Sequence, residues 1–149
     1  MMISDDKKKA RRALVAAVIG NTLEWYDFAV YGFLATILAN HFFPATDEVT
    51  SLLRTFAAFG VGFAARPIGG IIFGHLADRK GRKFTLVLTI QLMAAATLLI
   101  GILPTYSQIG LAAPIILVLA RLLQGFSAGG EWGGGTAFIV EWAGKNKRG

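Results

Sequence analysis

Long apolar stretches alternate with short charged blocks along the 149 residues of this chain. An α-helix of about 20 apolar residues, at 1.5 Å per residue, crosses the roughly 30 Å hydrocarbon core of a bilayer. The pattern therefore predicts an all-α membrane protein with four transmembrane helices. The predicted helices cover residues 13–39, 52–76, 84–103 and 111–140. The remaining segments are a cytoplasmic tail over 1–12, a cytoplasmic loop over 77–83 and a cytoplasmic C-terminal segment over 141–149.

The basic N-terminal tail and the apolar run that follows it share features with a cleavable signal peptide. A cleavable signal has a short, uninterrupted apolar core and a small-residue cleavage site. Here Glu24 and Asp27 interrupt the run, which continues to about Leu38. We therefore interpret this segment as a first membrane span that stays in the mature protein.

The composition also favours a membrane protein. Hydrophobic residues make up 54% of the chain and charged residues only 16%, whereas soluble domains carry about 25% charged residues. Twelve of the fifteen Lys and Arg residues fall on one side of the predicted helices, and basic loops favour the cytoplasmic side. The net charge of +6 thus reflects membrane topology rather than binding to nucleic acid. We expect a multi-pass protein of the plasma membrane, the inner membrane in a bacterium, surrounded by lipid and with a cytoplasmic N-terminus.

Five ionisable side chains lie inside the predicted helices: Glu24, Asp27, Arg66, Arg121 and Glu131. A charge at the bilayer centre costs at least about 2.5–3.5 kcal/mol, so such residues face a bundle interior or a wet cavity and mark functional sites. Helical spacing places them on faces with other polar or small residues. These companions are Asn21, Phe28 and Tyr31 in the first helix, Gly62, Gly70 and Gly74 in the second, and Gln124 and Ala128 in the fourth. Of these, we expect a cavity to be lined by Asn21, Tyr31 and Gln124.

Opposite charges at similar depths suggest pairing. Glu24 lies about 16 Å from the cytoplasmic start of its helix, and Arg121 about 15 Å from the outer start of its own. We hypothesise that Glu24 or Asp27 alternates between a protonated state and an ion pair with Arg121 or Arg66, because a desolvated carboxylate takes up a proton when its guanidinium partner leaves. The alternative is a static ion pair that only fixes helix register.

The third predicted helix holds none of these charges. Its polar side chains are Thr85, Thr89, Gln91 and Thr97. We therefore expect it to face lipid and to serve as a scaffold.

A specific motif lies between the second and third predicted helices. Its sequence is Gly74-His75-Leu76-Ala77-Asp78-Arg79-Lys80-Gly81-Arg82-Lys83. It resembles the loop signature of the major facilitator superfamily, a class of twelve-helix secondary transporters. Three further segments resemble the metabolite:proton symporters of that superfamily, which include carriers of proline/betaine, α-ketoglutarate, citrate and shikimate. They are Gly20–Phe28 with Tyr31-Gly32, Arg66–Gly70, and Arg121–Gly125 with Gly129–Gly134.

The resemblance implies a proton-coupled symporter of a small organic acid or zwitterionic metabolite, working by alternating access between two six-helix halves. It implies that Glu24 and Asp27 lie in the central cavity and that Arg121 takes part in proton transfer. Four helices correspond to the start of the twelve-helix fold. We therefore expect an N-terminal fragment whose partners are the small-molecule substrate and the remaining helices of the full-length transporter.

The same resemblance assigns the motif to cytoplasmic gating. It implies that Asp78, Arg79 and Arg82 form a charge network that latches one conformation. The gating motif as a whole comprises Gly74, Asp78, Arg79, Gly81, Arg82 and Lys83.

Two other functions fit the same span count. One is a complete small four-helix exporter that acts as a dimer, against which the loop motif argues, and the other is a non-transporting membrane fragment or assembly partner. The chain has no cysteine, no G-x-x-x-x-G-K-[ST] loop and no nucleophile with a partnered base, so we expect neither an enzyme nor ATP-driven transport. We expect no metal, no nucleic-acid partner and no cofactor, with a proton as the coupling ion.

Overall fold

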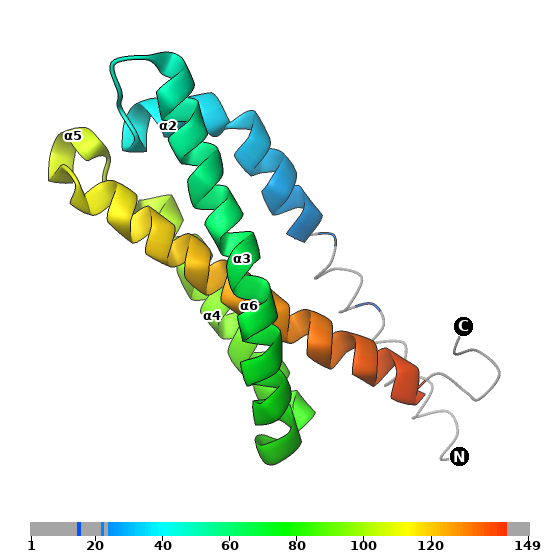
Figure 1. Ribbon diagram of the computed structural model, residues 1–149. Coiled ribbons are helices and arrows are strands. Elements are labelled where there is room, and N and C mark those ends of the chain that lie inside the picture. Colours follow the sequence, from blue (N-terminus) through cyan, green and yellow to red (C-terminus); the bar gives the residue numbers. More distant parts are fainter. Residues whose placement is uncertain (1–14, 16–21, 23, 143–149) are drawn as a thin grey trace. The chain divides into compact units, whose positions relative to one another are not determined.

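The computed structural model describes residues 15, 22 and 24–142, with side chains described as far as Glu131. The chain divides into two compact units, residues 1–33 with 135–149 and residues 34–134. All the labelled elements are helices (Figure 1). They are α2 (Ala35–Phe42), α3 (Glu48–Lys80), α4 (Arg82–Ile102), α5 (Tyr106–Ile109) and α6 (Ala112–Trp142).

Three helical segments among the described residues are long and apolar enough to cross a membrane: α3, α4 and residues 112–131 of α6. The prediction of an all-helical, multi-pass membrane protein is confirmed. The count of four spans is not, because the first predicted helix, over 13–39, begins outside the described residues. Its described part is helical over 24–33, departs from helical geometry at Leu34 (φ −89°, ψ 3°) and continues as α2 to Phe42, three residues beyond the predicted end.

Helix α3 is longer than the predicted 52–76 at both ends. Its 33 residues span about 50 Å, more than the hydrocarbon core requires. Asp47 caps its N-terminus by accepting hydrogen bonds from the backbone N–H of Thr50, at 3.1 Å, and from the Thr50 hydroxyl. These bonds, the hydroxyl first, lower the pKa of Asp47 below its ordinary value, because they stabilise the ionised carboxylate.

The cap predicts a pH-dependent contribution to stability. Because the folded pKa of Asp47 is lowered, the ionised cap stabilises α3 fully above the unfolded pKa, and this contribution is lost as the pH falls through the folded value. Asparagine also caps helices but does not titrate in this range. We expect Asp47→Asn to flatten the pH dependence of the unfolding free energy below about pH 4, and equal pH slopes for the two proteins would contradict this assignment.

A single residue, Gly81, separates α3 from α4, and the predicted loop over 77–83 is therefore almost entirely helical. Gly81 has φ 93° and ψ 146°, a conformation open to glycine and strained for other residues. Its N–H donates to the Ala77 carbonyl at 2.9 Å, and its own carbonyl accepts from the N–H and the hydroxyl of Thr85, both at 3.2 Å. The turn thus ends one helix and begins the next with a single residue between them.

Gly81→Ala tests this turn. An added Cβ would meet nothing within 4 Å, so its cost is backbone strain alone. We expect the free energy of unfolding to fall by about 1–3 kcal/mol. Gly101→Ala is the matched control, since Gly101 also has open space around an added Cβ but lies inside α4 at negative φ. Equal stability of the two variants would show that the turn tolerates any residue.

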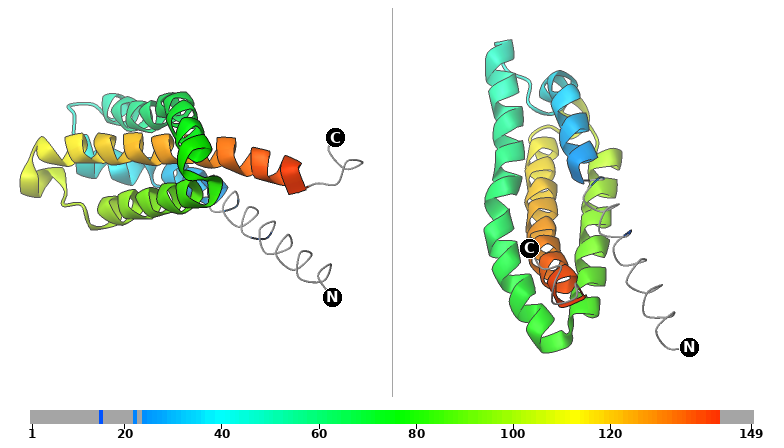
Figure 2. Two further views of the ribbon diagram at one scale, coloured as in Figure 1. Left: turned by 90° about the horizontal axis from the view of Figure 1, so that it is seen from below. Right: turned by 90° about the vertical axis from the view of Figure 1, so that its right-hand side faces the viewer.

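Helix α6 lies between α3 and α4 in both views of Figure 2. Where α2, α4 and α6 meet, an apolar cluster is formed by Phe42, Leu103, Ala113 and Leu117. Helix α4 buries the small stripe Thr85, Thr89 and Ala96 and exposes Leu86, Ile90 and Leu98. Large apolar side chains are favourable on the face of a helix that lies against lipid.

Candidate functional site

The site is built where α3 and α6 cross at backbone contact. A Cβ added at Gly125 would lie 1.7 Å from the carbonyl oxygen of Gly62, and one at Gly129 would lie 2.0 Å from that of Arg66. A Cβ at Gly69 would lie 1.9 Å from the carbonyl oxygen of Phe126. Only glycine allows such an approach, which small residues commonly provide between membrane helices. The Arg66 backbone is therefore held against α6.

The contact stripe matches the predicted groove at Gly62, Arg66 and Gly70 but not at Gly74. A Cβ built at Gly129 would lie 2.9 Å from the Gly70 backbone nitrogen, whereas a Cβ at Gly74 would meet nothing within 4 Å. The reason is geometric: at about 100° per residue, Gly74 lies about 120° around the helix from Gly62, whereas Gly69 lies within about 20° of it. Gly129 thus serves close packing of α6 against α3.

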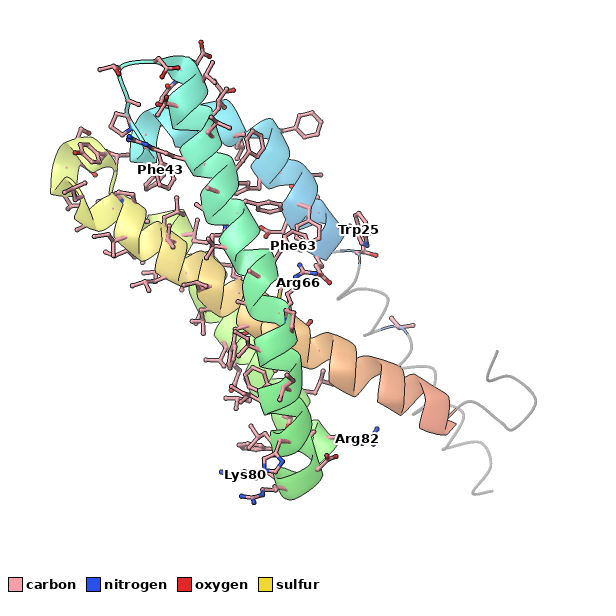
Figure 3. The ribbon with its side chains drawn as sticks, in the orientation of Figure 1. Trp25, Phe43, Phe63, Arg66, Lys80 and Arg82 are labelled. Atoms are coloured by element: carbon pink, nitrogen blue, oxygen red, sulfur yellow. The ribbon has the colours of Figure 1, made fainter. Side chains whose placement is uncertain are left out.

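Two arginines and two phenylalanines form a cluster along this crossing, which we call the arginine–phenylalanine cluster: Arg66, Phe63, Phe59 and Arg121. The Arg66 guanidinium carbon lies 4.2 Å from the centre of the Phe63 ring, and Figure 3 shows both side chains on the same stretch of α3. The Phe63 and Phe59 rings meet edge to face, with centres 5.3 Å apart. The Arg121 guanidinium carbon lies 6.0 Å from the Phe59 ring centre. Ring faces attract cations, so the phenylalanine pair joins a charge on α3 to a charge on α6.

Gln124 extends this cluster from α6 to α4. Arg121 Nη1 donates to Gln124 Oε1 at 2.8 Å, and Gln124 Nε2 donates to Thr97 Oγ1 at 2.8 Å. Arg121 and Gln124 are buried, with exposed fractions of 7% and 6%, and Ala128 beyond them is 2% exposed. Arg121, Gln124 and Ala128 thus share one buried face of α6.

Two guanidinium groups thus lie along an apolar helix crossing, with Arg121 buried and Arg66 half-buried. Arginine stays protonated at any physiological pH and presents a planar fork of N–H donors that matches a carboxylate. The cluster is therefore suited to attract and orient an anionic group.

Comparison with known proteins identifies the family. The family model for sugar (and other) transporters matches residues 13–149. The chain belongs to this transporter family. The family is one of transporters and not of enzymes, as the sequence predicted.

Three relatives of this transporter chain are bacterial carriers. The shikimate transporter of Escherichia coli (strain K12) is 52% identical over 141 residues, 94% of this chain and 32% of that protein. The glycine betaine/proline/ectoine/pipecolic acid transporter of Dickeya dadantii (strain 3937) is 45% identical over 144 residues, 97% of this chain and 29% of that protein. The putative proline/betaine transporter of Staphylococcus aureus (strain COL) is 52% identical over 137 residues, 91% of this chain and 29% of that protein.

These matches confirm the resemblance to metabolite transporters of the major facilitator superfamily. The chain spans about a third of the length of the curated relatives that it matches. No solved structure gives a significant match to it.

The other predicted site residues of this transporter chain lie in residues 24–33, further along α6 and at the α3–α4 turn. In the helical residues 24–33, Glu24 and Tyr31 are seven residues apart and share a face, with Asp27 beside it. Asn21 lies outside the described residues. Glu131 is half-buried on α6, ten residues and about 15 Å along the helix from Arg121.

The gating motif lies at the end of α3 and the start of α4. Asp78, Arg79 and Lys83 are exposed, and Arg82 is half-buried. Figure 3 shows Lys80 and Arg82 at this end of the helix pair, where Lys80 Nζ lies 5.6 Å from the Phe84 ring centre. Within the part of the chain that the structure describes, no three His, Asp or Glu side chains group closely enough to hold a metal.

Sequence reasoning missed Phe59, Phe63 and Thr97. Phe59, Phe63 and Arg66 follow the i, i+4, i+7 spacing of one helical face, a signal that could have found both phenylalanines. Thr97 had no such signal, because its partner Gln124 lies on another helix 27 residues away.

Proposed function

We propose that the protein containing this chain is a proton-coupled symporter of a small organic acid or zwitterionic metabolite, working by alternating access in the plasma membrane with its N-terminus in the cytoplasm. The observation that carries the proposal is the arginine–phenylalanine cluster: two guanidinium groups held in an apolar helix crossing. Both solute classes carry a carboxylate, the natural partner of a guanidinium. The relatives named for shikimate and for proline and betaine support the same solute chemistry. The chain's length relative to those proteins supports a cavity completed by further helices.

We assign different roles to the two arginines. Arg66 is half-buried, which supports a role in facing the carboxylate of the solute. Arg121 is 7% exposed and bonded to Gln124, so it is the fixed counter-charge of the carboxylate that carries the proton, for which Glu24 and Asp27 are the candidates. A carboxylate beside a guanidinium is held ionised, and one that leaves it for apolar surroundings takes up a proton. Exchange between these states couples proton entry to solute movement.

The motif at the α3–α4 turn supports the gating step. Gly81 gives a one-residue turn with positive φ, and the charges around it, including Asp78 and Arg79, are exposed. We assign Asp78, Arg79 and Arg82 to a cytoplasmic charge network that stabilises one conformation of the transporter. Charge pairs at an interface that opens and closes provide such a two-state latch.

Solute uptake by proteoliposomes tests the function. The protein expressed from its complete gene is reconstituted, an acid-outside proton gradient is imposed, and uptake of radiolabelled shikimate, proline and glycine betaine is measured. We expect at least one solute to accumulate, and a protonophore to abolish the accumulation. Uptake of every solute no greater than in protein-free vesicles, or accumulation that the protonophore leaves unchanged, would overturn the proposal.

Glu24→Gln and Asp27→Asn identify the proton carrier. Each change removes one titratable group and keeps the side chain's size and polarity. We expect one of the two variants to lose the stimulation of uptake by an acid-outside gradient, because a side-chain amide cannot bind and release the coupled proton. Unchanged proton coupling in both variants would exclude both carboxylates.

A further inference from the structure

We propose that Thr97 and Gln124 are positioning residues that fix the orientation of the Arg121 guanidinium, a role that rests on the proposed function of Arg121. The carrying observation is the hydrogen-bonded chain from Arg121 Nη1 to Gln124 Oε1 and from Gln124 Nε2 to Thr97 Oγ1, with both bonds at 2.8 Å. These two hydrogen bonds link α6, which carries Arg121, to α4, which sequence reasoning treated as a scaffold.

Hydrogen-bonding chemistry fixes the direction of this chain. Arginine has only donors, so the Gln124 side chain must turn its oxygen toward Arg121. Its amide nitrogen then points the other way and needs an acceptor, which Thr97 supplies. Arg121 therefore sets which end of the Gln124 amide faces the guanidinium, and the hydroxyl at position 97 holds the amide in that place.

Thr97 differs from the other threonines of α4. Thr85 donates to the Gly81 carbonyl and Thr89 to the Leu86 carbonyl, each within its own helical turn, which is the usual arrangement for threonine in a helix. Thr97 instead accepts a hydrogen bond from a residue of α6. Its hydroxyl is the polar tie between α4 and the cluster.

The guanidinium of Arg121 is thus restrained from two sides. Gln124, held by Thr97, accepts a hydrogen bond from its Nη1, and the centre of the Phe59 ring of α3 lies 6.0 Å from its guanidinium carbon. The orientation of Arg121 therefore depends on the relative positions of α3, α4 and α6. Side chains held in place by a supporting shell bind their partners with less loss of entropy.

Rotation of the Arg121 side chain gives a test that needs no transport. The protein expressed from its complete gene, with ¹⁵N-labelled arginine, is studied by NMR in detergent, and the Arg121 signals are assigned by their loss in Arg121→Lys. We expect Thr97→Val, which keeps the shape but lacks the hydroxyl, to speed rotation about the Nε–Cζ bond about fivefold, as expected for one lost hydrogen bond. Thr97→Ser keeps the hydroxyl and should match the wild type. The same rotation rate in wild type and Thr97→Val would overturn the proposal.

Uptake gives the second arm. We expect Thr97→Val to lower proton-driven uptake about fivefold per folded protein, and Thr97→Ser to transport at the wild-type rate. In a Gln124→Met background, Thr97→Val should cause no further loss of uptake, because the two residues act through the same hydrogen-bonded series. Full additivity of the two substitutions would overturn the proposal. Absence of uptake by the wild type would overturn the proposed function instead, while the NMR comparison would still decide the positioning role.

Discussion

Gly125→Ala is expected to destabilise the protein by about 1–3 kcal/mol, the cost of overpacking a close contact. Alanine normally favours a helix over glycine by about 1 kcal/mol, so the sign of the effect is diagnostic. The added Cβ would lie 1.7 Å from the carbonyl oxygen of Gly62, a backbone atom that cannot rotate away. The helices α3 and α6 must separate to admit it, which also pulls apart the arginine–phenylalanine cluster. The measurement is the free energy of unfolding in detergent micelles.

Gly60→Ala is the control for this substitution. Gly60 lies on α3 only two residues from Gly62, yet a Cβ there would meet nothing within 4 Å. We expect Gly60→Ala to leave stability unchanged or to raise it by up to about 1 kcal/mol. If Gly125→Ala were as stable as Gly60→Ala, the backbone contact between α3 and α6 would be refuted.

Arg66→Met is expected to remove the preference for a charged solute. If Arg66 binds the carboxylate, the wild-type protein binds the accumulated solute more tightly than the methyl ester of that solute. We expect this preference to fall about 10- to 100-fold in Arg66→Met, which is the usual contribution of a charge-assisted hydrogen bond. Methionine keeps an apolar side chain at this position and lacks the guanidinium. The measurement is the dissociation constant of each ligand for each protein, determined by isothermal titration calorimetry.

Arg66→Lys refines this comparison. Lysine keeps the charge but lacks the planar fork of donors, so we expect a preference between those of wild type and Arg66→Met. An equal preference for acid over ester in wild type and Arg66→Met would show that another group recognises the carboxylate.

The hydrophobic pattern predicted the elements well because membrane helices must be long and apolar. The spans around α3, α4 and α6 follow from this constraint, and the enclosed face of α6 follows from helical periodicity. The break at Leu34 and the single-residue turn at Gly81 were not predicted. A charged segment resembles a loop in sequence even when, as at 77–80, it continues a helix beyond the hydrocarbon core.

The candidate site was only half predictable. Arg66, Arg121 and Gln124 stand out because polar residues are costly in a membrane helix. Their connections depend on how α3, α4 and α6 are placed against each other, and periodicity within one helix carries no such information. Periodicity therefore placed Gly74 in the helix contact, where the structure has Gly69. It also left Thr97 on a scaffold helix, although its hydroxyl bonds to Gln124 of α6.

The most direct test of Arg121 as the counter-charge of the proton step compares two modes of transport in one variant. Proteoliposomes with wild type or Arg121→Met are assayed for solute accumulation driven by a proton gradient and for exchange of labelled against unlabelled solute without a gradient. If Arg121 serves the proton step and Arg66 binds the solute, proton-driven accumulation by Arg121→Met falls at least about 100-fold, as expected when a paired buried charge is removed. Solute exchange without a gradient stays near the wild-type rate in the same variant. Retention of proton-driven accumulation, or loss of exchange together with accumulation in folded protein, would contradict this assignment.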